Sequence, residues 1–207
     1  MPNVRDEIKG LLAKDDFDIY MKLLDNDVSA HRLEAQKKEQ IVVKSMETAK
    51  LLYDNLVKEF GEGDIYKYVY ASKVPINYVK EKPTKYYAYI GLFSGETKTI
   101  TINLETIMLI KKTAESMNID DLVAINPIKD VVVAHEFFHY LEMINPDIYT
   151  NQKIIEGKII GIFKTKSQLL AAGEIAAIHF SKLMTKLPHT PLVYNKIFSV
   201  GKKLTIH

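Results

Sequence analysis

The chain has 207 residues, of which 47% are hydrophobic and 26% charged, and its formal net charge is +2. This length and composition are typical of a soluble globular protein that buries its own core, and the small charge argues against a nucleic-acid-binding protein. The chain contains no cysteine. That excludes a disulfide framework and a zinc site built on thiolates, so a metal would need histidine and carboxylate ligands.

The sequence carries no signal for a membrane or for export. The first ten residues, MPNVRDEIKG, include no apolar signal region, and no stretch reaches about 18 uninterrupted apolar residues. We therefore expect a cytoplasmic protein without a membrane partner. The sequence gives no indication of its oligomeric state.

The first 62 residues have the composition of helices, because they contain no proline after Pro2 and are rich in Lys, Glu, Leu and Ala. The pattern predicts three helices, at about 3–13, 16–25 and 29–60. Asp27 or Ser29 is suited to cap the third helix, and the sequence GEG at 61–63 is suited to end it.

A short helix at 64–72 is followed by a change to strand patterns. The segment VPINYVKE at 74–81 predicts one strand, and KYYAYIGLF and TKTITIN, which flank SGE at 94–96, predict a hairpin. In TKTITIN, Ile100 and Ile102 alternate with threonine and asparagine, so we expect one buried and one solvated face.

The remaining elements are predominantly helical. A helix is predicted at about 104–118, and Asn126 followed by Pro127 is a good start for a further helix that ends before Asn145 and Pro146. The segment 153–163 is ambiguous and predicts a hairpin or an extended segment around Gly157. The last predictions are a Thr165–Gln168 capping box for a helix that runs to about 186, and a final short helix or extended segment after Pro188 and Pro191.

The segment VVVAHEFFHYLEM contains the pattern HExxH, with His135, Glu136 and His139. Residues four apart on a helix are separated by about 400° of rotation and about 6 Å of rise, so both histidines face one side and can bind a single ion. Zinc accepts imidazole nitrogen. Glu136 lies about 100° from His135 around the helix and is placed to reach a water molecule that the metal activates, without binding the metal itself. The alternative is a pair of core histidines beside a surface glutamate.

A catalytic zinc site needs a third protein ligand, and the best candidate is Glu174 in LLAAGEIAAIHF. Its helical neighbours are all apolar: Leu170, Ala171, Ala177 and Ile178. A carboxylate in such surroundings is costly unless it meets a cation. The alternative is a Glu174 that pairs with a lysine or reaches solvent.

Other residues are weaker candidates. Glu142 could reach the rim of the site, although a surface salt bridge is the simpler expectation, and His189 or Tyr194 could supply a donor to the transition state. No supporting pattern is found for the remaining histidines, which are His31, His179 and His207.

HExxH on one helix and a glutamate on a later helix resemble the gluzincin arrangement of zinc metallopeptidases. Within it, GEIAAIHF, read as Glu174-x-x-Ala177-x-x-Phe180, is similar to the third-ligand helix of the ImmA/IrrE family of bacterial metallopeptidases, and the resemblance covers roughly residues 40–185. This chain departs from the family pattern at Phe138 and Met143, where members often carry glycine and histidine.

The resemblance implies an α+β, zincin-like fold, in which a small twisted antiparallel or mixed sheet packs on the HExxH helix and the glutamate helix. The first segment, 1–62, is then expected to pack as additional helices on a catalytic unit, 63–207, in one compact molecule. The ligand set would be His135, His139 and Glu174.

The function expected from this site is that of a zinc metalloendopeptidase with Glu136 as general base and a peptide or protein as substrate. TKTITIN could be an edge strand to which an extended peptide adds over the metal, or an ordinary edge strand. The resemblance also implies an alternative, a regulatory protein of the same fold that acts by binding a partner such as a transcription regulator.

Overall fold

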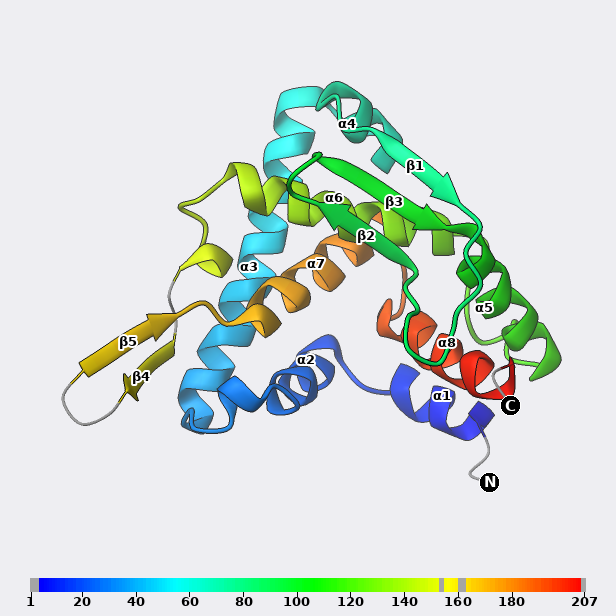
Figure 1. Cartoon of the computed structure of the whole chain (residues 1–207), viewed down its shortest axis with the longest axis horizontal. Coiled ribbons are helices and arrows are strands. Elements are labelled where there is room, and N and C mark those ends of the chain that lie inside the picture. The colour runs from blue at the N-terminus through cyan, green and yellow to red at the C-terminus, as the bar shows by residue number, and fades with distance from the viewer. Residues whose placement is uncertain (1–3, 153–154, 160–162, 206–207) are drawn as a thin grey trace.

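The computed structural model describes residues 4–152, 155–159 and 163–205, and it describes 155–159 and 163–167 by their backbone alone. These residues form an α+β protein with eight α-helices, two 3-10 helices and five strands (Figure 1). The helices are α1 (Val4–Leu12), α2 (Asp16–Asp25), η1 (Val28–Ala30), α3 (Ala35–Phe60), α4 (Ile65–Ala71), α5 (Leu104–Ser116), α6 (Ile128–Ile144), η2 (Tyr149–Asn151), α7 (Leu170–Thr185) and α8 (Leu192–Thr205). The strands are β1 (Ile76–Val79), β2 (Gly91–Ser94), β3 (Thr99–Asn103), β4 (Ile155–Ile159) and β5 (Phe163–Ser167).

The main sheet is a three-stranded mixed sheet in the order β1-β3-β2. Strand β3 runs parallel to β1 and antiparallel to β2, with Ile100 opposite both Ile76 and Phe93. Ile100 and Ile102 are fully buried, as the alternation predicts. The expectation that TKTITIN is an edge strand is wrong, because β3 is paired on both sides. Its last residue, Asn103, is also buried. Its side chain accepts a hydrogen bond from the Glu81 N–H and donates one to the Glu81 carbonyl, which satisfies its polar atoms.

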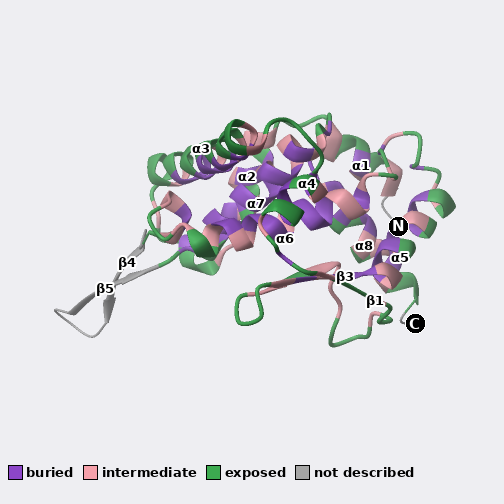
Figure 2. Cartoon of the chain, turned by 90° about the horizontal axis from the view of Figure 1, so that it is seen from above, coloured by how far each residue is buried: buried purple, intermediate pink, exposed green. Residues whose placement is uncertain are grey.

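The two helices that carry the candidate ligands lie in the middle of the molecule. Figure 2 shows the sheet on one side of α6 and α7 and the long helix α3 on the other. Helix α6 packs against α7, β2 and β3, and α7 packs against α3. Phe137, Phe138 and Phe180 are fully buried between these layers. Helix α6 is apolar around most of its circumference because neighbours cover it on several sides.

The N-terminal helices take part in two cores. Ile8 of α1 and Leu52 and Leu56 of α3 belong to the main core beneath the sheet. A second, smaller core joins α2, α3 and the first half of α7 around residues such as Leu24 and Ile175. The N-terminal segment therefore supports the glutamate helix directly.

Most predicted helices are confirmed, but the third begins later than predicted. The side chain of Asp27 accepts a hydrogen bond from the Ser29 N–H and stabilises the 3-10 turn η1 instead of capping a long helix. This local bond competes with helix formation. Ala30, the last residue of η1, is buried in the second core, and α3 begins only at Ala35. Its end at Gly61, with φ +75°, is confirmed.

Two further cap predictions are wrong. The N-cap of α6 is Pro127 rather than Asn126, and no side chain caps it. Thr165 lies in β5 and forms no capping box for α7, since the Gln168 amide donates instead to the carbonyl of Thr150. Gly157 lies within β4 opposite Thr165 of β5, so the hairpin or extended segment predicted around it is confirmed in the described residues.

The other sequence predictions agree with the structure, with shorter strands. The strand expected at 74–81 is present as β1 and the hairpin at 94–96 joins β2 to β3, whereas parts of the segment 153–163 lie outside the described residues. The tail forms α8, which is longer than the short helix expected. Within the described residues, no helix has both the length and the apolar character needed to cross a membrane.

Candidate metal centre

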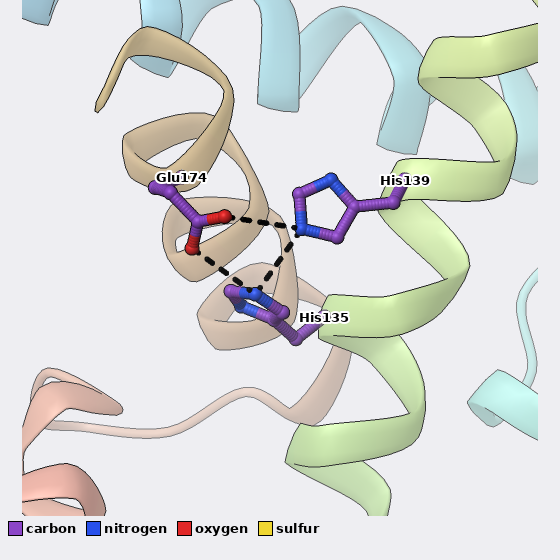
Figure 3. A group of neighbouring side chains, drawn as sticks. All are labelled: His135, His139 and Glu174. Atoms are coloured by element: carbon purple, nitrogen blue, oxygen red, sulfur yellow. Dashed lines mark hydrogen bonds and ion pairs between the residues drawn. The ribbon is translucent and has the colours of Figure 1, made fainter. Parts of the chain in front are cut away.

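Helices α6 and α7 bring His135, His139 and Glu174 together, as Figure 3 shows. The Nε2 atoms of the two histidines are 3.3 Å apart. The two oxygens of the Glu174 carboxylate lie 3.5 Å from them, Oε2 next to His135 and Oε1 next to His139. In the part of the chain that the structure describes, this is the one histidine and carboxylate group suited to hold a metal ion.

The separation of the two histidine nitrogens is that of two ligands in a tetrahedral metal site. Two ligand atoms that each lie about 2.0–2.1 Å from zinc in a tetrahedral site are about 3.3–3.4 Å from one another. The two histidine nitrogens are 3.3 Å apart, and each lies 3.5 Å from a different oxygen of the Glu174 carboxylate, so the carboxylate faces both nitrogens. Two imidazoles and one carboxylate are also a donor set that zinc accepts, with a fourth position left for water or substrate.

The protonation of His139 is set by a neighbour on its own helix. Its Nδ1 lies 3.3 Å from Oε2 of Glu142, and an ionised carboxylate only accepts hydrogen bonds, so Nδ1 carries the proton. In the neutral ring, the lone pair on Nε2 is then directed toward His135 and Glu174. The arrangement resembles the carboxylate–histidine pairs that orient metal ligands.

The pKa values of His139 and Glu174 are both shifted by neighbouring groups. Burial alone would lower the pKa of His139, but the hydrogen bond to Glu142 and the charges of Glu174 and Glu136 outweigh it and raise the pKa. Burial alone would raise the pKa of Glu174, yet the hydrogen bond and positive charge of His135, with that of His139, hold the pKa below its usual value. The site thus favours an ionised glutamate beside its histidines.

Glu136 faces strand β2 from a position beside His135, in the wall of the same pocket, and is 8% exposed. Burial raises the pKa of its carboxyl group, and the neighbouring histidines oppose this increase. Strand β2 approaches it at Gly91, where an added Cβ would lie 2.8 Å from Oε1 of Glu136 and 2.5 Å from Cγ1 of Val132. Only glycine allows β2 this close to the helix.

A pocket of about 210 Å³ opens at this site, and His135, Glu136 and Glu174 are part of its wall. The rest of the wall is largely apolar, with Val131, Val132, Ile178, Pro191 and Leu192. Polar groups come from Tyr89, Ser181 and Asn195. The pocket can therefore hold an apolar side chain next to the metal ligands.

Two tail residues that were considered as transition-state donors point elsewhere. The Tyr194 hydroxyl donates to the carbonyl of Ala124, and His189 Nε2 accepts from the N–H of the same residue. Neither is part of the pocket wall, whereas their neighbour Asn195 is. The expectation that Tyr194 or His189 reaches the site is therefore wrong for this structure.

The other candidate histidines lie away from the three ligands. His179 contacts Tyr20 of α2, with its Nδ1 3.4 Å from the hydroxyl, and His31 contacts the Asp25 carbonyl. His207 lies outside the described residues.

Sequence reasoning undervalued Glu142, which forms no surface salt bridge with a lysine in the described residues but bonds His139 instead. Its position three residues after His139 on the same helix was the available signal. Sequence reasoning also missed two glycines: Gly91, which faces Glu136, and Gly173, which faces Glu142. No local pattern identifies these glycines, because each is required by a contact between elements far apart in the chain.

Comparisons of the chain with models of protein families, with curated proteins and with solved structures found no match.

Proposed function

We propose that this chain is a zinc metalloendopeptidase. The observation that carries the proposal is the convergence of three side chains: the Nε2 atoms of His135 and His139 are 3.3 Å apart, and each lies 3.5 Å from an oxygen of the Glu174 carboxylate. Such a group can hold one metal ion. The three side chains come from two helices. His135 and Glu174 line a pocket together with the buried Glu136, and His139 is next to His135 and Glu174. Together with the mixed sheet next to α6, this supports the zincin-like architecture that the sequence resemblance implies.

His135, His139 and Glu174 would hold the ion. Bound zinc supplies positive charge that lowers the pKa of a water molecule and polarises the scissile carbonyl. Glu136 takes the proton from the attacking water as the carbon–oxygen bond forms, and delivers it to the leaving amine as the carbon–nitrogen bond breaks. Its raised pKa suits this exchange, because a carboxylate titrating closer to neutral pH both accepts and returns a proton more readily.

The substrate-binding edge is assigned to β2 rather than to β3. Strand β2 pairs only with β3 in the described sheet, which leaves its other edge free. The chain leading into it, Tyr89 to Gly91, lines the pocket beside Glu136. An extended peptide can add to this edge through main-chain hydrogen bonds and pass over the ligands.

The pocket favours substrates with an apolar side chain next to the scissile bond. Val132, Ile178 and Leu192 form an apolar wall within the same 210 Å³ that the ligands border. Burying one medium-sized apolar side chain there would contribute roughly 1.5–3 kcal/mol.

The test is digestion of a peptide library, with new chain ends identified by mass spectrometry. Zinc-loaded wild type should cleave beside apolar residues, and Glu136→Gln should cleave about 10²–10⁴ times more slowly while keeping its zinc. Glu115→Gln, at an exposed glutamate of α5, is the matched control and should cleave as wild type does. A zinc-loaded wild type that cleaves nothing in the library would contradict the proposal and favour the alternative of a regulatory binding protein.

A further inference from the structure

Glu142 is held in an unusual position for a glutamate next to a metal site. Its side chain is only 14% exposed, and Oε2 lies 3.3 Å from Nδ1 of His139. Its other oxygen, Oε1, is buried and has no hydrogen-bond partner among the described residues. A buried carboxylate with one unpartnered oxygen destabilises a fold by about 1–3 kcal/mol or more, so its presence calls for a compensating role.

Helix α7 leaves space for this carboxylate at Gly173. A Cβ added there would lie 2.9 Å from Oε1 and 3.3 Å from Oε2 of Glu142. Gly173 directly precedes Glu174 in the chain. Glycine in the interior of a helix is costly by roughly 0.5–1 kcal/mol relative to alanine, and here it makes room for Glu142.

The charges also fit. The described ligand group contains one carboxylate, Glu174, and two imidazoles, so a divalent cation would leave the group with a net positive charge. The carboxylate of Glu142, which contacts His139, adds negative charge that offsets this positive charge. Its bond to Nδ1–H also fixes the imidazole with Nε2 free to bind.

We propose that Glu142 is a positioning residue of the metal centre and holds His139 in its metal-binding tautomer and orientation. Position 173 is then glycine because a side chain there would displace the Glu142 carboxylate. The inference rests on the proposed zinc site. Glu142 touches neither the substrate nor the reacting atoms and acts through His139.

The experiment measures the zinc dissociation constant by competition with a chromophoric chelator, alongside urea unfolding of the zinc-free forms. Glu142→Ala should weaken zinc binding about 10- to 100-fold. Glu142→Gln keeps an oxygen that accepts from Nδ1–H but loses the charge, so its zinc affinity should lie between those of wild type and Glu142→Ala. Asp130→Ala is the matched control, because Asp130 is a half-buried carboxylate on the same helix that accepts from the Tyr66 hydroxyl, and it should bind zinc as wild type does.

Gly173→Ala tests the second half of the inference. Its Cβ should displace the Glu142 carboxylate and weaken zinc binding in the wild-type background, yet have little effect on zinc binding in the Glu142→Ala background. Gly10→Ala, at a glycine with open space around it, controls for the glycine-to-alanine exchange in a helix.

The outcomes separate the claims. Zinc affinity of Glu142→Ala within about twofold of wild type would overturn the inference while the zinc site stood. A loss of stability of the zinc-free Glu142→Ala form with unchanged zinc affinity would also overturn it, since that is what a purely structural glutamate would show. A wild type that binds no zinc would overturn the proposed function itself, and the inference with it.

Discussion

Two carboxylates of α6 are each faced by a glycine from another element. Gly91 of β2 faces Glu136, and Gly173 of α7 faces Glu142. In both places any larger residue would place a carbon atom within 3 Å of a carboxylate oxygen. Glycine at these two positions is therefore needed for the carboxylates to lie where they do.

At Gly91 we expect substitution by alanine to disturb both packing and catalysis. The added Cβ would overlap Val132 and Glu136, so β2 must shift away from α6. Overpacking of this kind costs about 1–3 kcal/mol. Urea unfolding of Gly91→Ala should show this loss. Gly95→Ala, in the same hairpin, places its Cβ 3.7 Å from Met143 Sδ, an ordinary contact, and an equal loss in that variant would contradict the explanation.

The sequence identifies some residues of the candidate site and not others. His135, Glu136 and His139 follow from a local spacing on one helix, and Glu174 follows from a charge among apolar neighbours. The structure brings the two histidines and Glu174 together. Glu142 and its glycine partner depend on how α6 and α7 cross, which no local pattern specifies.

At the scale of elements, the apolar helix α6 was predictable and its cap was not. A run of valines and phenylalanines on the HExxH helix indicates burial on several sides, and Val133, Phe137 and Phe138 are indeed fully buried. The N-cap prediction failed because Pro127 takes that position without any side-chain bond. The order of strands also escaped prediction, since alternation in β3 fixes its faces but not its neighbours.

Two polar contacts connect helix α7 to α2, and one of them, made by His179, is expected to make the free energy of unfolding depend on pH. His179 contacts Tyr20, and Lys182 forms an ion pair of 2.6 Å with Asp16. Burial lowers the pKa of His179; the charge of Asp16 opposes the decrease and that of Lys182 adds to it. The folded state therefore favours the neutral ring more than the unfolded state does.

We expect the free energy of unfolding to decrease in acid because of His179. Because the folded pKa of His179 is depressed, its contribution is complete above the unfolded value of about 6.5 and is lost as the pH falls through the folded value. Urea unfolding of the zinc-free protein at several pH values measures it. His179→Gln should lose less stability than wild type over this range, and the exposed control His31→Gln should follow wild type. Identical pH profiles for wild type and His179→Gln would exclude the effect.

At the scale of the whole molecule, the candidate site lies between two helices that pack on different layers. Helix α6 lies against the sheet, and α7 lies against α3 and the second core (Figure 1). The three candidate ligands come from both helices, so an ion bound between them would connect α6 on the sheet side to α7 on the α3 side. Binding to the folded chain alone stabilises it.

Zinc should accordingly raise the melting temperature. At a free zinc concentration of about 100 times the dissociation constant, binding contributes about 2.7 kcal/mol, which corresponds to an increase of about 5–10 °C for a chain of this size. Scanning calorimetry with and without zinc measures the shift. Magnesium, which prefers oxygen ligands, should have little effect. A shift of the same size in Glu174→Ala would show that zinc stabilises the chain from another site.

The most direct test of the metal centre is the zinc content per chain, measured by mass spectrometry on wild type, Glu174→Ala and the control Glu115→Ala. The proposed site predicts about one zinc ion per chain in wild type and in the control, and much less in Glu174→Ala. Full zinc in all three would remove Glu174 from the ligand set. A wild type without zinc after reconstitution would contradict the metal centre, and with it the proposed peptidase.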